Sequence, residues 1–396
     1  MTSNACIAPW IHLHTWPNNN VYPCCLTAME DTIGNLNDNT LEEIWNNDAM
    51  KQLRTQFLNN EQPKSCKRCF VNEKHGGTSL RKHMNKTFNH HMHLLEKTNA
   101  DGSLDDLSIH YWDFRFSNIC NMRCRSCGPQ LSTGWYEDQK KMWGKLPNDL
   151  PDPGKNINMW NQIEPLFDIV EDIYFAGGEP LLMEEHYRIL NRLDEMQKYD
   201  TIIRYNTNFS QLRYKKLDVL EIWPKFKEVV VGASIDGFGP RAEYIRKGTD
   251  WNKIVANRKA MLERAPGVNF FVNFTVSVQN AYHMLDFYEW ALEDKFIANT
   301  GDFHTNLVHH PEHLSLQILP ANMKKDLTEK YTAMAEKCRS WGEDRVEGHF
   351  LAVAKFMNDA DTSHLIPEFK KNIEMVDIIR NENFAETFPE LQDLVK

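Results

Sequence analysis

Nine cysteines carry the strongest chemical signal in this sequence, and eight of them lie in its first third. Cys120, Cys124 and Cys127 form a CxxxCxxC pattern directly after a β-rich run. Iron–sulfur clusters are held by cysteine thiolates, normally four to a cluster. Three thiolates in one loop would therefore hold three irons and leave the fourth open to another ligand. The alternative is a zinc site, which needs a fourth ligand that the nearby sequence does not offer.

A second set of cysteines, Cys6, Cys24, Cys66 and Cys69, lies nearer the start of the chain. Four thiolates complete either one 4Fe–4S cluster or one zinc site with four cysteine ligands, and the number of cysteines does not choose between them. Cys25 is adjacent to Cys24 and is the alternative ligand. The two sets together predict two metal centres.

Short β-rich runs alternate with longer helical stretches from about residue 109 onward. The expected strands are 108–117, 172–176, 201–206, 228–235, 268–278 and 303–309. Strands that alternate with helices of about 10–15 residues indicate βαβ units and a parallel sheet. Six such units predict an α/β fold, a partial (β/α)6 barrel of the TIM type. The loops at the carboxyl ends of such strands build active sites, and the cysteine triad follows the first strand.

Four segments are expected along the chain: a cysteine-rich cluster module (1–75), a polar linker with a helix (76–108), the barrel (109–310) and a helical extension (311–396). The extension shows helical stretches at 322–339, 346–358 and 368–381. His90, His91 and His93 lie in the linker, and we expect them to form a solvated face and not a metal site.

The composition indicates a globular protein of a reducing compartment. Apolar residues make up 41% of 396 residues, and 45 Lys+Arg against 55 Asp+Glu give a net charge of −10. This acidic balance argues against a duplex nucleic-acid binder. No run reaches the ~18 apolar residues that a membrane span needs, and the N-terminus lacks a basic region followed by an apolar one. We therefore expect a cytoplasmic protein whose clustered cysteines bind metal.

The triad and the motifs after it resemble the radical S-adenosylmethionine (SAM) superfamily, over about residues 109–310. Gly177-Gly178-Glu179-Pro180 follows the second expected strand and is similar to the family's GGEP motif. The resemblance implies that SAM chelates the open iron through its methionine amine and carboxylate. It also implies that Gly177, Gly178 and Glu179 lie against the methionine amino group.

Further positions match the family in the same order. Thr207-Asn208 ends the third expected strand, with Phe209 where relatives often carry glycine. Ser234-Ile-Asp-Gly ends the fourth and is followed by Arg246, a pattern similar to that of peptide-modifying relatives. Ser126 occupies a position that is often aromatic in relatives, where the backbone of this residue usually contacts the adenine of SAM. The resemblance thus implies cofactor contacts from Ser126, Asn208, Ser234 and Arg246.

The N-terminal cysteines stand in sequence patterns that resemble the twitch or SPASM extensions of radical SAM enzymes. These patterns include Cys6-Ile-Ala-Pro-Trp, Val-Tyr-Pro-Cys24 and Cys66-Lys-Arg-Cys69. Such extensions bind auxiliary clusters, and the number of ligands here fits the one-cluster twitch form. The spacing of the family pattern favours Cys24 over Cys25 as a ligand. Asn19, a residue that tolerates positive φ, replaces an expected glycine. The order also departs from the family, because such modules usually follow the barrel.

The expected function is reductive cleavage of SAM to methionine and a 5′-deoxyadenosyl radical, which removes hydrogen from a peptide or protein substrate. A reducing partner such as flavodoxin or ferredoxin would supply the electron. The alternatives are the same chemistry on a small molecule, such as dehydrogenation of an alcohol or sugar, and a non-catalytic iron–sulfur or zinc protein. No residue identifies itself as a catalytic hydrogen donor, and the substrate stays open.

Overall fold

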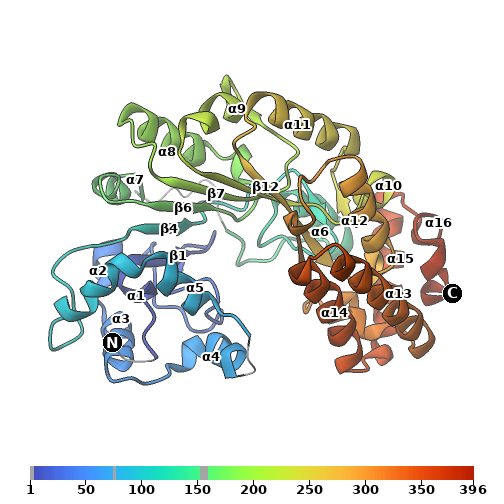
Figure 1. Ribbon diagram of the computed structural model, residues 1–396, viewed down its shortest axis with the longest axis horizontal. Helices are drawn as coiled ribbons and strands as arrows, with labels where there is room; N and C mark the ends of the chain where they lie inside the picture. Colours follow the sequence, from blue (N-terminus) through green and yellow to red (C-terminus); the bar gives the residue numbers. More distant parts are fainter. Residues whose placement is uncertain (1–3, 75–76, 152–158) are drawn as a thin grey trace.

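The computed structural model describes residues 4–74, 77–151 and 159–396 (Figure 1). Its centre is a nine-stranded sheet in the order β13-β12-β10-β7-β6-β4-β1-β2-β3. Within this sheet, the six strands from β13 through β4 lie side by side, and each is parallel to the next. They are β4 (Tyr111–Phe114), β6 (Asp172–Phe175), β7 (Ile202–Thr207), β10 (Val229–Ser234), β12 (Asn269–Val276) and β13 (Phe303–Leu307). Strands that follow one another along the chain are neighbours in the sheet, and the expected six-stranded α/β core is confirmed.

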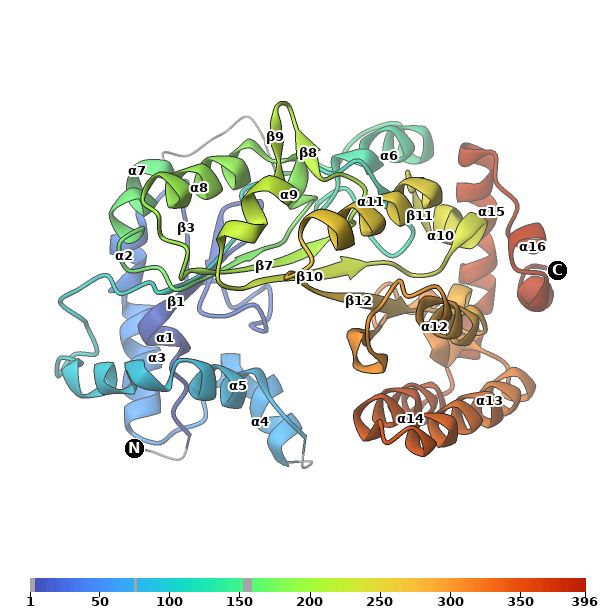
Figure 2. The same ribbon diagram turned by 45° about the horizontal axis from the view of Figure 1, so that its top comes forward.

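Helices cover the convex face of this sheet. In Figures 1 and 2, α8 (Glu184–Glu195), α9 (Val219–Ile222) and α11 (Trp251–Arg264) lie on that side. The strands alternate accordingly, because successive side chains point to opposite faces. In β12 the four buried side chains are all apolar, and one of them, Phe274, contacts Phe287 of α12 (His283–Glu293). The half-buried side chains between them face the concave side.

The N-terminal segment extends the same sheet beyond β4. β1 (His12–Thr15) pairs with β4 in parallel, and β2 (Asn20–Tyr22) and β3 (Gly34–Asn35) follow in antiparallel pairing. Asn19 has a φ of 69° in the turn between β1 and β2, a conformation that asparagine tolerates. Sequence analysis identified no strand among these residues. The cysteine-rich segment is therefore joined to the barrel sheet by backbone hydrogen bonds.

Residues 41–58 form two helices, α2 (Leu41–Trp45) and α3 (Asp48–Leu58), separated by a short break. The break has a local cause. The side chain of Asn47 accepts a hydrogen bond from the Met50 backbone N–H and so starts a new helix. A capping box, with Thr40 as the N-cap, starts α2. The segment continues through η1 (Lys64–Cys66) and α4 (Lys67–Lys74).

The linker and the C-terminal extension are helical, as expected. The linker forms α5 (Leu80–Thr87) and η2 (Asn89–Lys97). The extension forms α13 (Ala321–Ser340), α14 (Asp344–Asp359), α15 (Ile366–Arg380), α16 (Phe384–Thr387) and η12 (Pro389–Val395). Within the described ranges, no helix combines the length and the apolar character that crossing a membrane requires.

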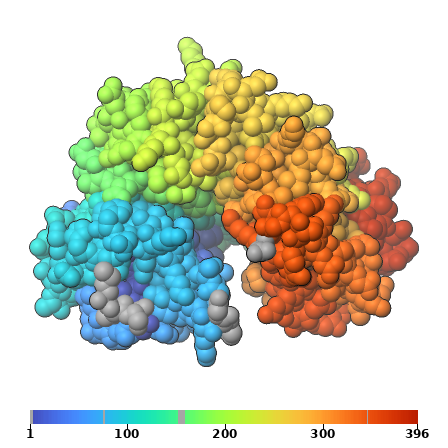
Figure 3. All heavy atoms as spheres, viewed as in Figure 1, coloured from blue at the N-terminus to red at the C-terminus, as the bar shows by residue number. Residues whose placement is uncertain are grey.

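Two lobes flank the concave side of the sheet. We call residues 4–74 and 77–108 the N-terminal lobe and residues 311–396 the C-terminal lobe. Figure 3 shows an opening between the N-terminal lobe, in blue, and the α13–α14 part of the C-terminal lobe, in orange and red. The concave face of the sheet lies above this opening in the same view (Figure 1).

Candidate functional site

The loop after β4 carries Cys120, Cys124 and Cys127, all half-buried free thiols. Three hydrogen bonds shape it. The Cys127 N–H donates to the Cys124 carbonyl at 3.0 Å, and the Cys120 N–H donates to Thr133 Oγ1 at 3.2 Å. The indole of Trp135 donates to the Cys124 carbonyl at 3.0 Å. The loop is therefore held in place by its own chain.

Burial changes the acidity of these thiols. It raises the pKa of Cys120 and of Cys127 to about 12, and it raises the pKa of Cys124 although the neighbouring Arg246 opposes this shift. A buried thiol with a high pKa keeps its proton unless a metal ion replaces it. Without a metal, the three thiols are therefore protonated at neutral pH, and metal binding would have to release these protons.

Two donors from other strands reach the cysteine sulfurs. Nδ2 of Asn208, just after β7, lies 3.9 Å from Cys120 Sγ. Nη1 of Arg246 lies 3.6 Å from Cys124 Sγ, and its Nε donates to the buried Asp236 at 2.7 Å. β11 (Arg246–Lys247) pairs antiparallel with β5 (Arg123–Cys124), which fixes this approach. Hydrogen bonds to cluster sulfurs are one means by which proteins set reduction potential.

The two glycines after β6 permit close contact with the cysteine loop. Gly177 has a φ of 80° and Gly178 a φ of 45°. A Cβ at Gly178 would lie 2.4 Å from the carbonyl oxygen of Ile119, the residue before the first cysteine of the loop. The Glu179 N–H donates to the same carbonyl at 2.7 Å. Glycine is required at this point by both conformation and space.

The Glu179 carboxylate is fully buried and is bonded within the chain. Oε1 accepts from Thr207 Oγ1 at 2.6 Å and from the Leu181 N–H at 3.0 Å, while Oε2 accepts from the Asn208 N–H at 2.6 Å. Burial raises the pKa of Glu179 to about 7 despite these bonds. The carboxylate ties the turn after β6 to the end of β7. Oε2 retains acceptor capacity for one further donor.

The remaining candidate positions lie at the same edge of the sheet. Ser234 is the last residue of β10 and is half-buried, and Ser126 is half-buried within the cysteine loop. Carboxyl ends of neighbouring parallel strands meet at one edge. The loops and strand ends after β4, β6, β7 and β10, together with β11, therefore place all seven positions expected at a cofactor along this edge of the sheet. These are Ser126, Gly177, Gly178, Glu179, Asn208, Ser234 and Arg246.

A polar floor that sequence analysis did not identify lies on the concave face. Asn273 of β12 donates to Asn206 of β7 at 2.7 Å, across the intervening strand β10. Gly232 of β10 stands between them, and a Cβ there would lie 2.7 and 2.8 Å from the two amides. The lack of a side chain at Gly232 makes this contact possible. A lone glycine within a strand is the sequence signal for such a close approach.

The second cysteine set surrounds a cavity in the N-terminal lobe. Cys6, Cys24, Cys66 and Cys69 are all among its lining residues, whereas Cys25 is not. Apolar side chains complete the wall, among them Leu53, Phe57, Leu80 and Met84. Burial raises the pKa of Cys6 to about 12 and of Cys66 to about 11. This set of four sulfur donors around one cavity fits one sulfur-ligated metal centre.

The C-terminal extension braces the cysteine loop. The buried Arg125, between two of the cysteines, pairs with Asp377 at 2.5 Å and with Glu382 at 2.6 Å. Arg380 of α15 pairs with the buried Asp138 of α6 (Tyr136–Trp143) at 2.7 Å. Figure 2 shows α15 and α16 beside α10 (Gly239–Ile245) and β11. Partners some 240 to 257 residues apart give no local sequence signal.

Comparison with protein families finds one match. Residues 6–70 match the model of SPASM, an iron–sulfur cluster-binding domain. The resemblance expected for the N-terminal cysteines is thereby confirmed over these residues, and they include all four cysteines of the second set. No curated protein matches the chain.

Solved structures give only distant likenesses. Native anSMEcpe with bound AdoMet and Cp18Cys peptide is 16% identical, with a TM-score of 0.38 over 57% of this chain and 59% of that one. Streptococcus suis SuiB bound to precursor peptide SuiA is also 16% identical, with a TM-score of 0.40 over 66% and 54%. The chain thus spans less than two thirds of either relative. At TM-scores below 0.5, these likenesses support no conclusion about the activity of this chain.

Proposed function

We propose that this protein is a radical SAM enzyme whose SAM-binding 4Fe–4S cluster is held by Cys120, Cys124 and Cys127. The observation that carries the proposal is the meeting of this triad with two sulfur-directed donors, Asn208 and Arg246, at the carboxyl edge of a six-stranded parallel sheet. Three thiolates leave one iron for an exogenous ligand. The SPASM match to residues 6–70 supports an iron–sulfur protein independently of the triad.

The residues around the triad have distinct roles in this proposal. Reductive cleavage of SAM, which yields methionine and the 5′-deoxyadenosyl radical, is the chemistry that the bound cofactors supply. Arg246, held by Asp236, presents a guanidinium suited to the methionine carboxylate. Glu179 keeps the glycine turn against the cysteine loop and offers its remaining acceptor capacity to the methionine ammonium. Ser126 and Ser234 complete the binding edge.

We infer that Cys6, Cys24, Cys66 and Cys69 hold one auxiliary 4Fe–4S cluster. The cavity between them and the SPASM match support this inference. The lining favours Cys24 over Cys25 as the fourth ligand, since Cys25 is exposed and lies outside the cavity wall.

We propose a peptide or protein side chain as the substrate. The opening between the two lobes gives an extended chain access to the concave face (Figure 3). The floor beneath it offers amide donors and acceptors from Asn206 and Asn273, which suit a polar backbone. A small alcohol or sugar is the second candidate, because the same amides would also bind hydroxyl groups. A flavodoxin or ferredoxin in a cytoplasmic setting would deliver the electron.

Iron and sulfide content after anaerobic reconstitution tests the two-cluster proposal. The wild-type protein should hold about 8 iron atoms per chain, and Cys124→Ala and Cys24→Ala should each hold about 4. Cys25→Ala, the matched neighbour of Cys24, should keep about 8. Stoichiometric zinc in either cysteine set, with iron correspondingly low, would contradict the proposal.

A further inference from the structure

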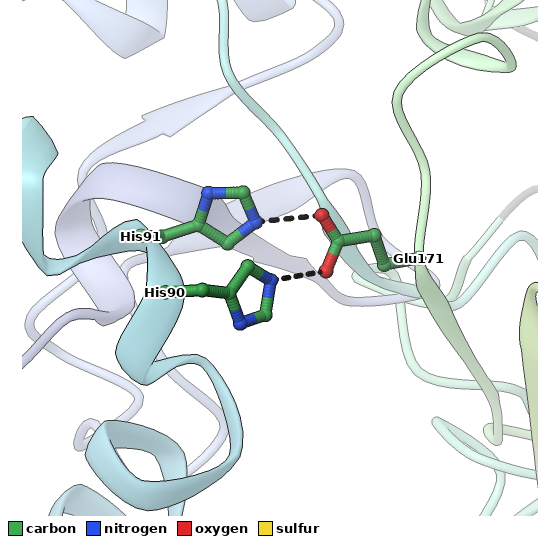
Figure 4. A group of neighbouring side chains, drawn as sticks. All are labelled: His90, His91 and Glu171. Carbon is green, nitrogen blue, oxygen red and sulfur yellow. Dashed lines mark hydrogen bonds and ion pairs between the residues drawn. The ribbon is translucent and has the colours of Figure 1, made fainter.

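Three side chains that commonly bind metals converge at the amino ends of the strands, at the opposite edge of the sheet from the cysteine loop. His90 and His91 belong to η2, and Glu171 directly precedes β6 (Figure 4). His90 Nε2 lies 2.8 Å from Glu171 Oε2, and His91 Nε2 lies 2.7 Å from Glu171 Oε1. One ligand atom from each residue falls within 4.8 Å of the other two.

This convergence is not what η2 alone would produce. Successive residues of a 3-10 helix point about 120° apart. The two imidazoles nevertheless turn toward the same carboxylate, with ring centroids 4.2 Å apart. His91 is only 8% exposed, so the expected solvated face is wrong for this residue. Its ring stacks on His110 at 3.9 Å, and His110 is itself anchored through Nδ1 to the Ile169 carbonyl at 2.8 Å.

A pair of hydrogen bonds is the simplest state of this cluster. In that state each Nε2–H donates to an oxygen of the Glu171 carboxylate. A neutral imidazole that keeps its proton on Nδ1 presents a lone pair at Nε2. The two Nε2 atoms, which face different oxygens of Glu171, then supply two nitrogen ligands for a divalent ion, and the carboxylate supplies the oxygen ligand.

The observed spacing is close to what such an ion needs. Zinc binds histidine nitrogen at about 2.0–2.1 Å and carboxylate oxygen at about 2.0–2.2 Å. In a tetrahedral site these bonds place nitrogen and oxygen about 3.3 Å apart. The pairs at 2.7 and 2.8 Å would have to open by about half an ångström. The exposed side chain of His90 is free to make that adjustment.

We propose that His90, His91 and Glu171 bind one zinc ion, with water completing its coordination. The ion would join the linker that leads from the cysteine-rich segment to the base of β6. The site is separate from both cysteine sets, and the proposal does not rest on the function proposed above. Nitrogen and oxygen ligands at a partly exposed position suit zinc, which has no redox chemistry and accepts this geometry.

Metal analysis of the cluster-loaded protein tests the proposal. The protein is equilibrated anaerobically with Zn2+, desalted, and analysed for iron, zinc and manganese in one sample. The wild type should carry one zinc per chain at full iron content. Glu171→Gln, which keeps the shape but removes the anionic ligand, and His90→Ala, at an exposed position, should each bind zinc at least about 100-fold more weakly in competition with a chelating dye.

His83→Ala is the matched control, because His83 is exposed on the neighbouring helix α5. It should bind zinc as the wild type does. Circular dichroism and iron content of Glu171→Gln and His90→Ala should equal those of the wild type, so that loss of zinc reports the site and not misfolding. Equal zinc binding by all four proteins would overturn the proposal. So would no zinc in the wild type, or iron or manganese in place of zinc.

Discussion

The guanidinium of Arg246 links Asp236 to Cys124. Its Nε donates to the Asp236 carboxylate at 2.7 Å while its Nη1 lies 3.6 Å from the Cys124 sulfur. Asp236 is 1% exposed and also accepts from the Thr275 N–H at 2.8 Å. The carboxylate of Asp236, which follows β10 and is hydrogen-bonded to β12, thus orients the arginine. Its position is set before any cofactor arrives.

Replacing Arg246 by lysine should weaken SAM binding at least about tenfold. A single ammonium group cannot bind Asp236 and also present the planar pair of N–H donors that suits a carboxylate. Iron content should stay that of the wild type, since no cysteine is removed. Anaerobic equilibrium dialysis with SAM measures the change. Arg264→Lys serves as the control, because Arg264 pairs with Asp218 on the convex side. Unchanged SAM affinity in Arg246→Lys would contradict the role given to this residue.

Alanine at Gly178 should destabilise the protein more than alanine at Gly144. Both glycines have positive φ, which costs an alanine about 1–2 kcal/mol. At Gly144 a Cβ meets nothing within 4 Å, but at Gly178 it meets the Ile119 carbonyl at 2.4 Å. The difference in free energy of unfolding by urea isolates the clash, which we expect to add about 1–3 kcal/mol. An equal loss of unfolding free energy in both variants would show that a Cβ at Gly178 does not clash with the Ile119 carbonyl.

Stability of the cluster-free protein should depend on pH through Glu179. Burial raises its pKa from 4.5 to about 7, so the folded state binds this proton more tightly than the unfolded state. This contribution is complete below pH 4.5 and is lost as pH rises to about 7, by about 3 kcal/mol in total. Glu179→Gln should remove that part of the slope in urea unfolding between pH 5 and 7. A slope unchanged by the substitution would contradict the assignment.

Replacing Asp138 should weaken the ion pairs through which α6 joins α15 to the cysteine loop. Asp138 accepts from Arg380 at 2.7 Å and from Arg123 at 2.6 Å. Asp138→Asn leaves the buried Arg380 without its counter-charge, which costs about 3–5 kcal/mol. Faster loss of iron from the first cysteine set should accompany the lower unfolding free energy. Asp326→Asn, in an exposed pair with Lys330, should change either quantity little.

The features that sequence analysis predicted correctly depend on residues close together in the sequence. Each of the six β-rich runs overlaps an observed strand. The run 201–206 stops one residue short of the end of β7, and the run 108–117 is longer than β4, which covers only Tyr111–Phe114. The cysteine spacing and the glycine pair indicated a site at the carboxyl ends, because loop positions after strands follow directly from element order.

The features that it missed depend on partners far apart in the chain. β1 pairs with β4 across some hundred residues, and its sequence, His-Leu-His-Thr, lacks the apolar and aromatic run that marks β4. Asn206 and Asn273 meet only because Gly232 lies between them. His91 was expected in solvent because its partner Glu171 lies 80 residues away. Such contacts are set by sheet register, which periodicity alone does not reveal.

Formation of 5′-deoxyadenosine from SAM by the anaerobic, dithionite-reduced protein tests the central claim most directly. The account predicts product from the wild type and from Cys25→Ala. It predicts none from Cys124→Ala whose auxiliary site still holds its iron. Absence of product from a wild-type protein with both sites loaded, or equal product from Cys124→Ala, would contradict it.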